Sequence, residues 1–260
     1  MTKILLLPPM EKIRISAVSY LNTLPFFYGL KHSAIQTRCD ISLDIPSVCA
    51  EKLISGKVDI GLIPVAAIPK VSNAQIISDY CIGANGKVKT VCLFSEVPLH
   101  EINTILLDYQ SRTSVMLVKI LAKEYWKINP EFVNAEAGFE NKIKGKTAAI
   151  VIGDRTFNLA SPYIFDLAEE WKKFAGLPFV FACWVANKTL PIDFISEFNH
   201  ALKNGLDNIN KTLEEFPPSV VSTAEAKKYL TENISYNFDS QKKKGLELFN
   251  ELSNKIISNS

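Results

Sequence analysis

The sequence has little histidine and no grouped cysteine, and both scarcities limit its chemistry. Its three histidines, His32, His100 and His200, join no cluster of polar residues at the end of a predicted strand. Its five cysteines are widely spread, with no C-x-x-C pair and no histidine beside a cysteine. Metal sites and disulfide frameworks depend on such spacing. The sequence therefore argues against a histidine base, a metal site and a disulfide-stabilised fold.

Long apolar runs and blocks of positive charge are missing as well. No segment approaches the roughly 20 apolar residues of a membrane-spanning helix. The apolar run in MTKILLLPPM is too short for a signal peptide, and Pro8 and Pro9 interrupt it. The net charge is +2, with lysines and arginines scattered among acids, so neither nucleic acid nor a membrane is an expected partner. Unpaired cysteines and the lack of a signal peptide favour a cytoplasmic protein.

Three common catalytic or nucleotide-binding motifs are also absent: the Walker loop, G-x-G-x-x-G and the nucleophile elbow. What remains is a chain of 260 residues with 47% hydrophobic and 22% charged residues. This composition is typical of a globular protein with one large domain or two ordinary lobes. If the chain is an enzyme, it is expected to orient an anionic substrate between neutral polar groups and helix ends.

One stretch, residues 13–30, organises the first half of the chain. Residues 13–18 are predicted to form a strand, and the polar residues Ser19, Tyr20, Asn22 and Thr23 follow at once. Asn22 or Thr23 is expected to cap a helix that begins there. A polar strand end that leads into a helix N-terminus is half of an anion site. The alternative is an ordinary capped helix that binds nothing.

The first hundred residues alternate between strand and helix. Strands are predicted at 40–45 and 57–64, with a helix at 48–55 between them. This order favours a parallel sheet with helices on its faces. Asn85-Gly86 then lies between two strand-like runs and predicts a hairpin joining 76–82 to 87–95.

The middle of the chain has its own strand–helix–strand pattern between two long apolar strands. Two strands that cross between lobes are typical of a two-lobed clamp with a ligand cleft. We therefore expect a discontinuous first lobe and a second lobe inserted into it. The predicted bounds are 11–94 with 185–260 for the first lobe, 97–180 for the second, and hinge strands near 91–96 and 178–186.

A second candidate site mirrors the first. Ser111, Arg112, Thr113 and Ser114 follow a predicted strand at 104–108 and begin an apolar helix. Hydroxyls and backbone N–H groups at a helix start bind carboxylates, and arginine adds a bidentate fork. The alternative is a capped helix with an arginine on the surface.

Two further polar residues stand near predicted strand ends. Thr90 follows Lys87-Val88-Lys89 and either points into the cleft or is an ordinary strand threonine. Asp154 follows the strand 148–152 and either faces the ligand or caps the next turn. Pattern reasoning alone ends at a two-lobed binder of a small anion.

Several blocks resemble a known family in the same order along nearly the whole chain. They are VSYLNTLPFFYGL, GKVDIGLIPVA, GKVKTVCLFS, LLDYQSRTSVMLVKIL, VIGDR, GLPFVFACW, YLTENISYNFD and KKKGLELFNE. These blocks resemble chorismate dehydratase of the futalosine route to menaquinone, the menaquinone biosynthesis protein A family. The resemblance implies an α/β, two-lobed, periplasmic-binding-protein-like (type II) fold with a cleft between the lobes. It also implies a carbon–oxygen lyase that converts chorismate to 3-[(1-carboxyvinyl)oxy]benzoate without metal or organic cofactor.

The resemblance assigns roles to two residues. Asn22 matches the family's active-site asparagine. The family's active-site serine is replaced here by Thr90, and the threonine keeps the hydroxyl. One alternative is the sister enzyme, 1,4-dihydroxy-6-naphthoate synthase, which shares the fold but relies on a histidine. The other is a non-enzymatic solute-binding protein for a small anion. The oligomeric state stays open, with a homodimer among the options.

Overall fold

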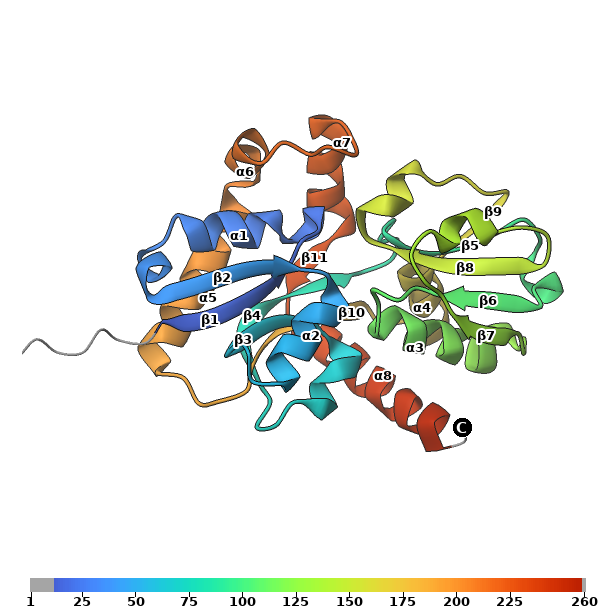
Figure 1. Ribbon diagram of the computed structural model, residues 1–260, viewed down its shortest axis with the longest axis horizontal. Coiled ribbons are helices and arrows are strands. Elements are labelled where there is room, and N and C mark those ends of the chain that lie inside the picture. Colours follow the sequence, from blue (N-terminus) through green and yellow to red (C-terminus); the bar gives the residue numbers. More distant parts are fainter. Residues whose placement is uncertain (1–11, 259–260) are drawn as a thin grey trace, which may run out of the picture.

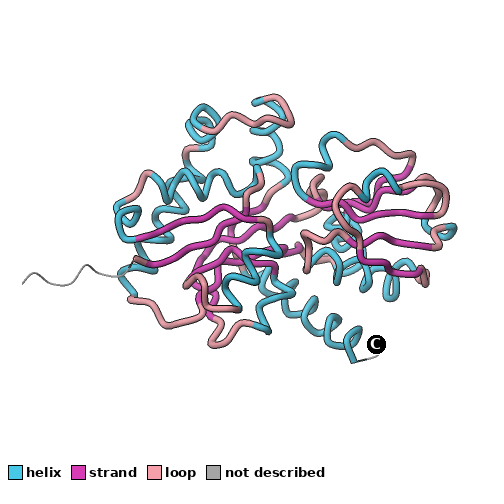
Figure 2. Tube along the Cα trace, in the orientation of Figure 1, coloured by secondary structure: helices cyan, strands magenta, loops and turns pink. Residues whose placement is uncertain are grey.

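A computed structural model describes residues 12–258, which form two lobes, each built around its own β-sheet (Figure 1; Figure 2). The expectations for the opening segment 1–10 lie outside the described residues. The first sheet has the order β11-β4-β10-β3-β1-β2 and the second the order β7-β6-β8-β5-β9. The strands are β1 Ile13–Val18, β2 Cys39–Asp44, β3 Ile60–Pro64, β4 Gln75–Ala84, β5 Val91–Ser95, β6 Thr104–Leu107, β7 Glu131–Asn134, β8 Thr147–Ile152, β9 Tyr163–Asp166, β10 Phe179–Ala186 and β11 Ser235–Asn237.

Helices cover both sheets and link the two lobes. The last helix, α8, packs against β10 of the first sheet and α3 of the second lobe (Figure 1). Within residues 12–258, no helix is long and apolar enough to cross a membrane. The α-helices are α1 Leu24–Lys31, α2 Pro46–Ile54, α3 Thr113–Ile120, α4 Leu167–Ala175, α5 Ile192–Asp207, α6 Ile209–Glu215, α7 Thr223–Lys228 and α8 Ser240–Ser258.

The central strands β3 and β10 of the first sheet are buried on both faces. The parallel strands β2, β1 and β3 match the predicted β-α-β-α-β order, and α2 packs on β1 and β3. On the other face, Trp184 of β10 contacts Phe26 of α1 and Phe198 of α5 edge-on. All eight residues of β10 are buried, as their uninterrupted apolar run predicts. The five cysteines are free and buried, where a thiol packs as a small hydrophobic group.

Two glycines allow α1 and α5 to touch backbone to backbone. A Cβ atom on Gly29 would lie 1.9 Å from the Ala201 carbonyl oxygen, and one on Gly205 would lie 1.7 Å from the Pro25 carbonyl oxygen. Any larger residue would push the helices apart. This close crossing fixes α1, which follows directly after the candidate site residue Asn22.

The predicted hairpin around Asn85-Gly86 is wrong. Strand β4 pairs with β10 and β11 in the first sheet, whereas β5 pairs with β8 and β9 in the second. Gly86 does have the positive φ of +117° that a turn requires, but the chain uses it to leave one sheet for the other. Long-range pairing therefore overrides the local turn signal.

The chain crosses between the sheets in two places. Residues 85–90 join β4 to β5, and residues 167–178, which include α4, join β9 to β10. The two strands expected to form the hinge are regular members of opposite sheets. The lobe bounds remain a proposal, in which we now assign β5 to the second lobe and β10 to the first because of their hydrogen-bonded partners.

Candidate active site

A partly open cavity lies where the lobes meet, and strands of both sheets contribute to its wall. Its wall combines the ends of β1, β3 and β4 with the starts of β5 and α3 and the end of β8. Its polar lining residues are Tyr20, Asn22, Thr90, Ser111, Thr113 and Ser114. The remaining lining residues are Gly153 and apolar residues, and no lining residue within 12–258 is charged.

Asn22 and Thr90 meet at this cavity from different parts of the chain. Asn22 belongs to a single 3-10 turn, Leu21–Thr23, after β1, and Thr90 ends the first crossing between the lobes. Both are buried, with 8% and 1% of their surface exposed. The hydroxyl of Tyr229 joins them: Asn22 Nδ2 donates to it over 3.3 Å, and Thr90 Oγ1 lies 2.7 Å from it.

The turn that carries Asn22 is capped from the opposite lobe. Neither Asn22 nor Thr23 caps α1 with its side chain, contrary to expectation. Instead, the Leu21 N–H donates to both carboxylate oxygens of Asp154, at 3.2 and 3.0 Å. Asp154 therefore acts as the cap of a distant turn, and it does not line the cavity. Burial raises the pKa of Asp154 to about 6, against the opposing effect of the Leu21 N–H.

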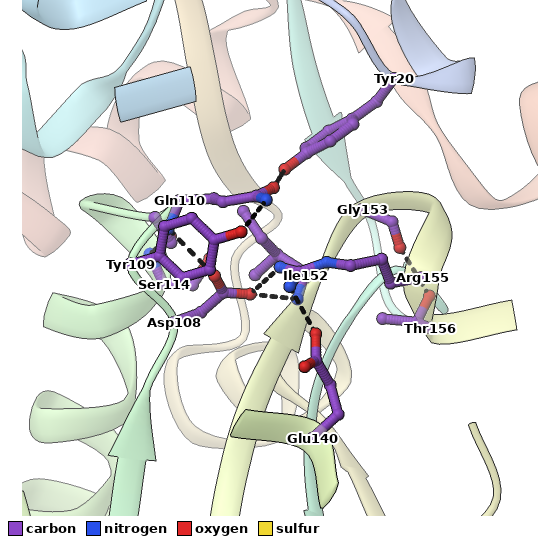
Figure 3. Close-up of polar contacts among 11 residues, drawn as sticks. Tyr20, Asp108, Tyr109, Gln110, Ser114, Glu140, Ile152, Gly153, Arg155 and Thr156 are labelled. Atoms are coloured by element: carbon purple, nitrogen blue, oxygen red, sulfur yellow. Dashed lines mark hydrogen bonds and ion pairs between the residues drawn. The ribbon is translucent and has the colours of Figure 1, made fainter. Parts of the chain in front are cut away.

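Tyr20 lines the cavity, and its side chain points toward Gln110 (Figure 3). Its hydroxyl donates to Oε1 of Gln110 across the cleft, and Gln110 Nε2 in turn donates to the Tyr109 hydroxyl over 2.9 Å. The Tyr20 ring lies so close to Gly153 that a Cβ atom there would come within 2.6–2.8 Å of it. Gly153 also has a φ of +73°, so both its conformation and its neighbour favour glycine.

An ionic cluster supports the loops behind this contact (Figure 3). Arg155 binds the buried carboxylate of Asp108 and, over 2.5 Å, that of Glu140. Asp108 also accepts from the backbone N–H groups of Gln110 and Ile152, both at 3.0 Å. The cluster thereby ties the loop after β6 to the loop after β8. These are the two loops that present Gln110 and Gly153 to Tyr20.

The start of α3 lines the cavity, but its hydroxyls differ in availability. Thr113 Oγ1 already donates to the Phe181 carbonyl over 3.0 Å and accepts from the Ala66 N–H. Ser111 Oγ accepts from the Ser114 N–H over 3.0 Å. Within residues 12–258 the Ser114 hydroxyl makes no hydrogen bond, so it is free to bind a ligand in the cavity.

Ser19 and Arg112 lie outside the cavity, contrary to the sequence pattern. Ser19 is exposed, and its N–H donates to the Asp44 carbonyl. Arg112 pairs with Glu51 over 2.8 Å, with 46% of its side chain exposed. It belongs to the turn that leads into α3, where its side chain reaches α2 rather than the cleft. Arg112 is therefore placed as a surface ion-pair partner.

The site is chemically neutral. It offers an amide, several hydroxyls and a helix N-terminus, which suit a small anion that is held and polarised by hydrogen bonds. None of the three histidines lines it, and no group of three or more potential metal ligands occurs in the described part of the chain.

Sequence reasoning missed Tyr229 and Gln110. Tyr229 is 207 residues from Asn22 in the chain, and Gln110 is 90 residues from Tyr20. No local pattern marks either residue. Their only signal is that they lie inside the blocks YLTENISYNFD and LLDYQSRTSVMLVKIL, which carry the family resemblance.

Solved structures of the same shape identify the fold. An Archaeoglobus fulgidus protein, AF1704, has a TM-score of 0.71 and 15% identity, covering 95% of this chain and 98% of its own. The Candida albicans CA3427 gene product, described as having the generic periplasmic binding protein fold, has a TM-score of 0.58 and 13% identity over 96% and 94% of the two chains. The alkanesulfonate-binding protein SsuA from Xanthomonas axonopodis pv. citri has a TM-score of 0.59 and 12% identity over 93% of each chain. The expected periplasmic-binding-protein-like fold is confirmed.

Sequence comparison gives the family. A chorismate dehydratase from Thermus thermophilus is 26% identical over 230 residues, which cover 80% of this chain and 84% of the relative. The sequence model of the menaquinone biosynthesis family matches residues 13–255, nearly the whole chain. The chain therefore belongs to the menaquinone biosynthesis family.

Proposed function

We propose that the protein is a chorismate dehydratase, a hydro-lyase that converts chorismate to 3-[(1-carboxyvinyl)oxy]benzoate and water. The observation that carries the proposal is the meeting of the Asn22 amide and the Thr90 hydroxyl in one buried inter-lobe cavity. The family resemblance assigns catalytic roles to these two positions. The related Thermus thermophilus protein is named a chorismate dehydratase, which supports the same activity.

The cavity suits the substrate's charge. Chorismate carries two carboxylates, and the start of α3 offers one of them a helix N-terminus together with the free Ser114 hydroxyl. The N-terminus of the turn Leu21–Thr23 is already capped by Asp154. The second carboxylate would therefore be bound by neutral side chains.

The reaction needs little from the protein beyond orientation and polarisation. Loss of the C4 hydroxyl with a proton from C3 makes the ring aromatic, so the equilibrium favours product. Asn22 and Thr90 are neutral and cannot act as strong bases; on this proposal they hydrogen-bond the departing C4 hydroxyl and hold the ring. Because none of the described lining residues carries a charge, a carboxylate of the substrate itself is the proton acceptor in this scheme.

The direct test is turnover of chorismate. We expect the purified protein, incubated with chorismate, to form 3-[(1-carboxyvinyl)oxy]benzoate, detected by mass spectrometry. Asn22→Ala should lower kcat about a hundredfold with a smaller change in KM, because such oriented donors act mainly in the transition state. Asn129→Ala, which changes an exposed asparagine outside the cavity, is the matched control and should keep full activity.

The alternatives predict different results. Tight chorismate binding by a folded protein, without product, would favour a non-enzymatic solute-binding protein. A sister-type synthase would leave chorismate untouched; the placement of all three histidines outside the cavity weighs against it. Wild-type kcat in Asn22→Ala would show that this amide has no part in turnover.

A further inference from the structure

The segment 229–236 near the end of the chain brings two tyrosine hydroxyls to the candidate active site. Tyr229 begins the π-helical turn Tyr229–Asn233, and Tyr236 is the middle residue of β11. Both side chains are buried, with 1% and 9% exposed. A buried hydroxyl is costly unless it is hydrogen-bonded, so the partners of these two groups show what the segment holds in place.

Both hydroxyls bind the residue that the resemblance places in catalysis. The Tyr236 hydroxyl donates to the backbone carbonyl of Asn22 over 2.9 Å. The Tyr229 hydroxyl accepts from Asn22 Nδ2 and also lies 2.7 Å from Thr90 Oγ1. Tyr229 is the one residue among 12–258 whose side chain hydrogen-bonds both Asn22 and Thr90.

The ring of Tyr229 is itself held from the second lobe. Phe157, in the loop after β8, packs edge-on against it, with ring centroids 5.3 Å apart and an interplanar angle of 89°. Such a contact sets the ring position without using its hydroxyl. The hydroxyl is therefore fixed by packing on one side and by Asn22 and Thr90 on the other.

The hydrogen-bond partners determine which way the protons point. Asn22 Nδ2 has only hydrogens to give, so the Tyr229 oxygen is the acceptor in that bond. Within residues 12–258, the Tyr229 proton then has Thr90 Oγ1 as its one acceptor. Thr90, having accepted this bond, keeps its own proton free for a ligand. The second hydrogen on Asn22 Nδ2 is free in the same way.

We propose that Tyr229 is a positioning residue for the proposed dehydration, because it holds the Asn22 amide and the Thr90 hydroxyl together and turns one donor of each toward the cavity. This inference rests on the proposed function. Tyr229 does not line the cavity, so it acts through the other two residues. Burial also raises the pKa of Tyr229 well above its ordinary value, which keeps the hydroxyl neutral at working pH.

The test compares turnover of chorismate by the wild type and by Tyr229→Phe, which keeps the ring against Phe157 and removes only the hydroxyl. Misaligned donors cost catalysis more than binding, so kcat should fall about tenfold to a hundredfold with KM within about twofold. Thr90→Val and the double variant Tyr229→Phe/Thr90→Val complete a cycle. The double variant should be about as slow as the slower single variant.

Two controls separate positioning from general stability. Tyr125→Phe removes a half-buried tyrosine hydroxyl in the second lobe, outside the cavity, and should leave kcat and KM unchanged. Replacement of Tyr229 by 4-aminophenylalanine keeps the ring shape and the donor to Thr90, but it offers Asn22 a much weaker acceptor. Its kcat should lie between those of the wild type and Tyr229→Phe, and it tests the proposal even if Tyr229→Phe folds poorly.

The outcomes for Tyr229 differ from those for the function itself. No product from wild-type enzyme would overturn the proposed function and the positioning role with it. Product from the wild type and an equal kcat from folded Tyr229→Phe would overturn the positioning role alone. So would independent, multiplicative losses in the double variant, because they would show that Tyr229 and Thr90 do not act as one unit.

Discussion

The buried carboxyl of Asp154 gives the sharpest stability prediction. It lies in the loop after β8, and within residues 12–258 its one hydrogen-bond partner is the backbone N–H of Leu21 in the other lobe. Its pKa rises from 3.8 to about 6 because burial disfavours the charged form more than this one hydrogen bond favours it. Deprotonation is therefore harder in the folded protein than in the unfolded chain.

The sign of the effect follows from this raised pKa. Between about pH 4 and pH 6 the folded protein binds the Asp154 proton more tightly than the unfolded chain does, so stability falls as pH rises through this range. A difference of about 2 units at about 1.4 kcal/mol per unit gives an upper limit of roughly 3 kcal/mol. Asp154→Asn remains neutral and can still accept from Leu21. It should be similar to the wild type at pH 4 and more stable at pH 7.

Urea unfolding of both proteins from pH 4 to pH 8 measures this difference directly. Taking the difference removes the titrations that the two proteins share. Asp79→Asn, which changes an exposed aspartate, is the control and should follow the wild type at every pH. Parallel stability curves for Asp154→Asn and the wild type would refute the reasoning, because a buried carboxyl with a raised pKa cannot produce them.

Three further predictions concern the cavity and its surroundings. Thr90→Ser should keep most of the chorismate turnover because it retains the hydroxyl, whereas Thr90→Val should lower kcat at least tenfold. Equal rates for the two variants would show that the hydroxyl has no part in catalysis. Arg112→Ala should leave KM unchanged and lower the free energy of unfolding, measured by thermal unfolding, by less than about 1 kcal/mol, because its pair with Glu51 is exposed. A tenfold rise in KM would show instead that Arg112 binds the substrate. Gly153→Ala should lower the free energy of unfolding by about 1–2 kcal/mol, because alanine is strained at this positive φ. Its Cβ atom should also displace the Tyr20 ring and raise KM. Unchanged stability and KM would contradict the geometry.

Local patterns predicted the elements that depend on residues close together in the sequence. The apolar run of β10 is buried throughout, and the β-α-β order of the first residues becomes the parallel trio β2-β1-β3. The hairpin predicted at Asn85-Gly86 was wrong because a turn signal does not determine which strands pair with each other. Pairing of β5 with β8 and β9 depends on residues more than 50 positions further along the chain.

The same distinction applies to the candidate site. Polar residues at strand ends were found by pattern, yet pattern alone treated Arg112 and Asn22 alike. The side-chain direction separates them: Arg112 reaches Glu51 on α2, whereas Asn22 turns inward to Tyr229. The predicted side-chain cap of α1 by Asn22 or Thr23 is absent, and Asp154 of the other lobe caps the preceding turn Leu21–Thr23. Such contacts depend on how the lobes meet, which no local spacing encodes.

The two proposed catalytic residues and the carboxylate that supports one of them come from different parts of the fold. Asn22 comes from the first lobe, Thr90 from the crossing between the lobes, and Asp154 from the second lobe. Asp154 caps the turn that carries Asn22, and the Gly153 N–H donates to the Thr90 carbonyl over 2.9 Å. Contact between the lobes therefore fixes both proposed catalytic residues at once. On the proposed function, the inter-lobe contacts that shape the cavity would also hold the donors for the C4 hydroxyl of chorismate.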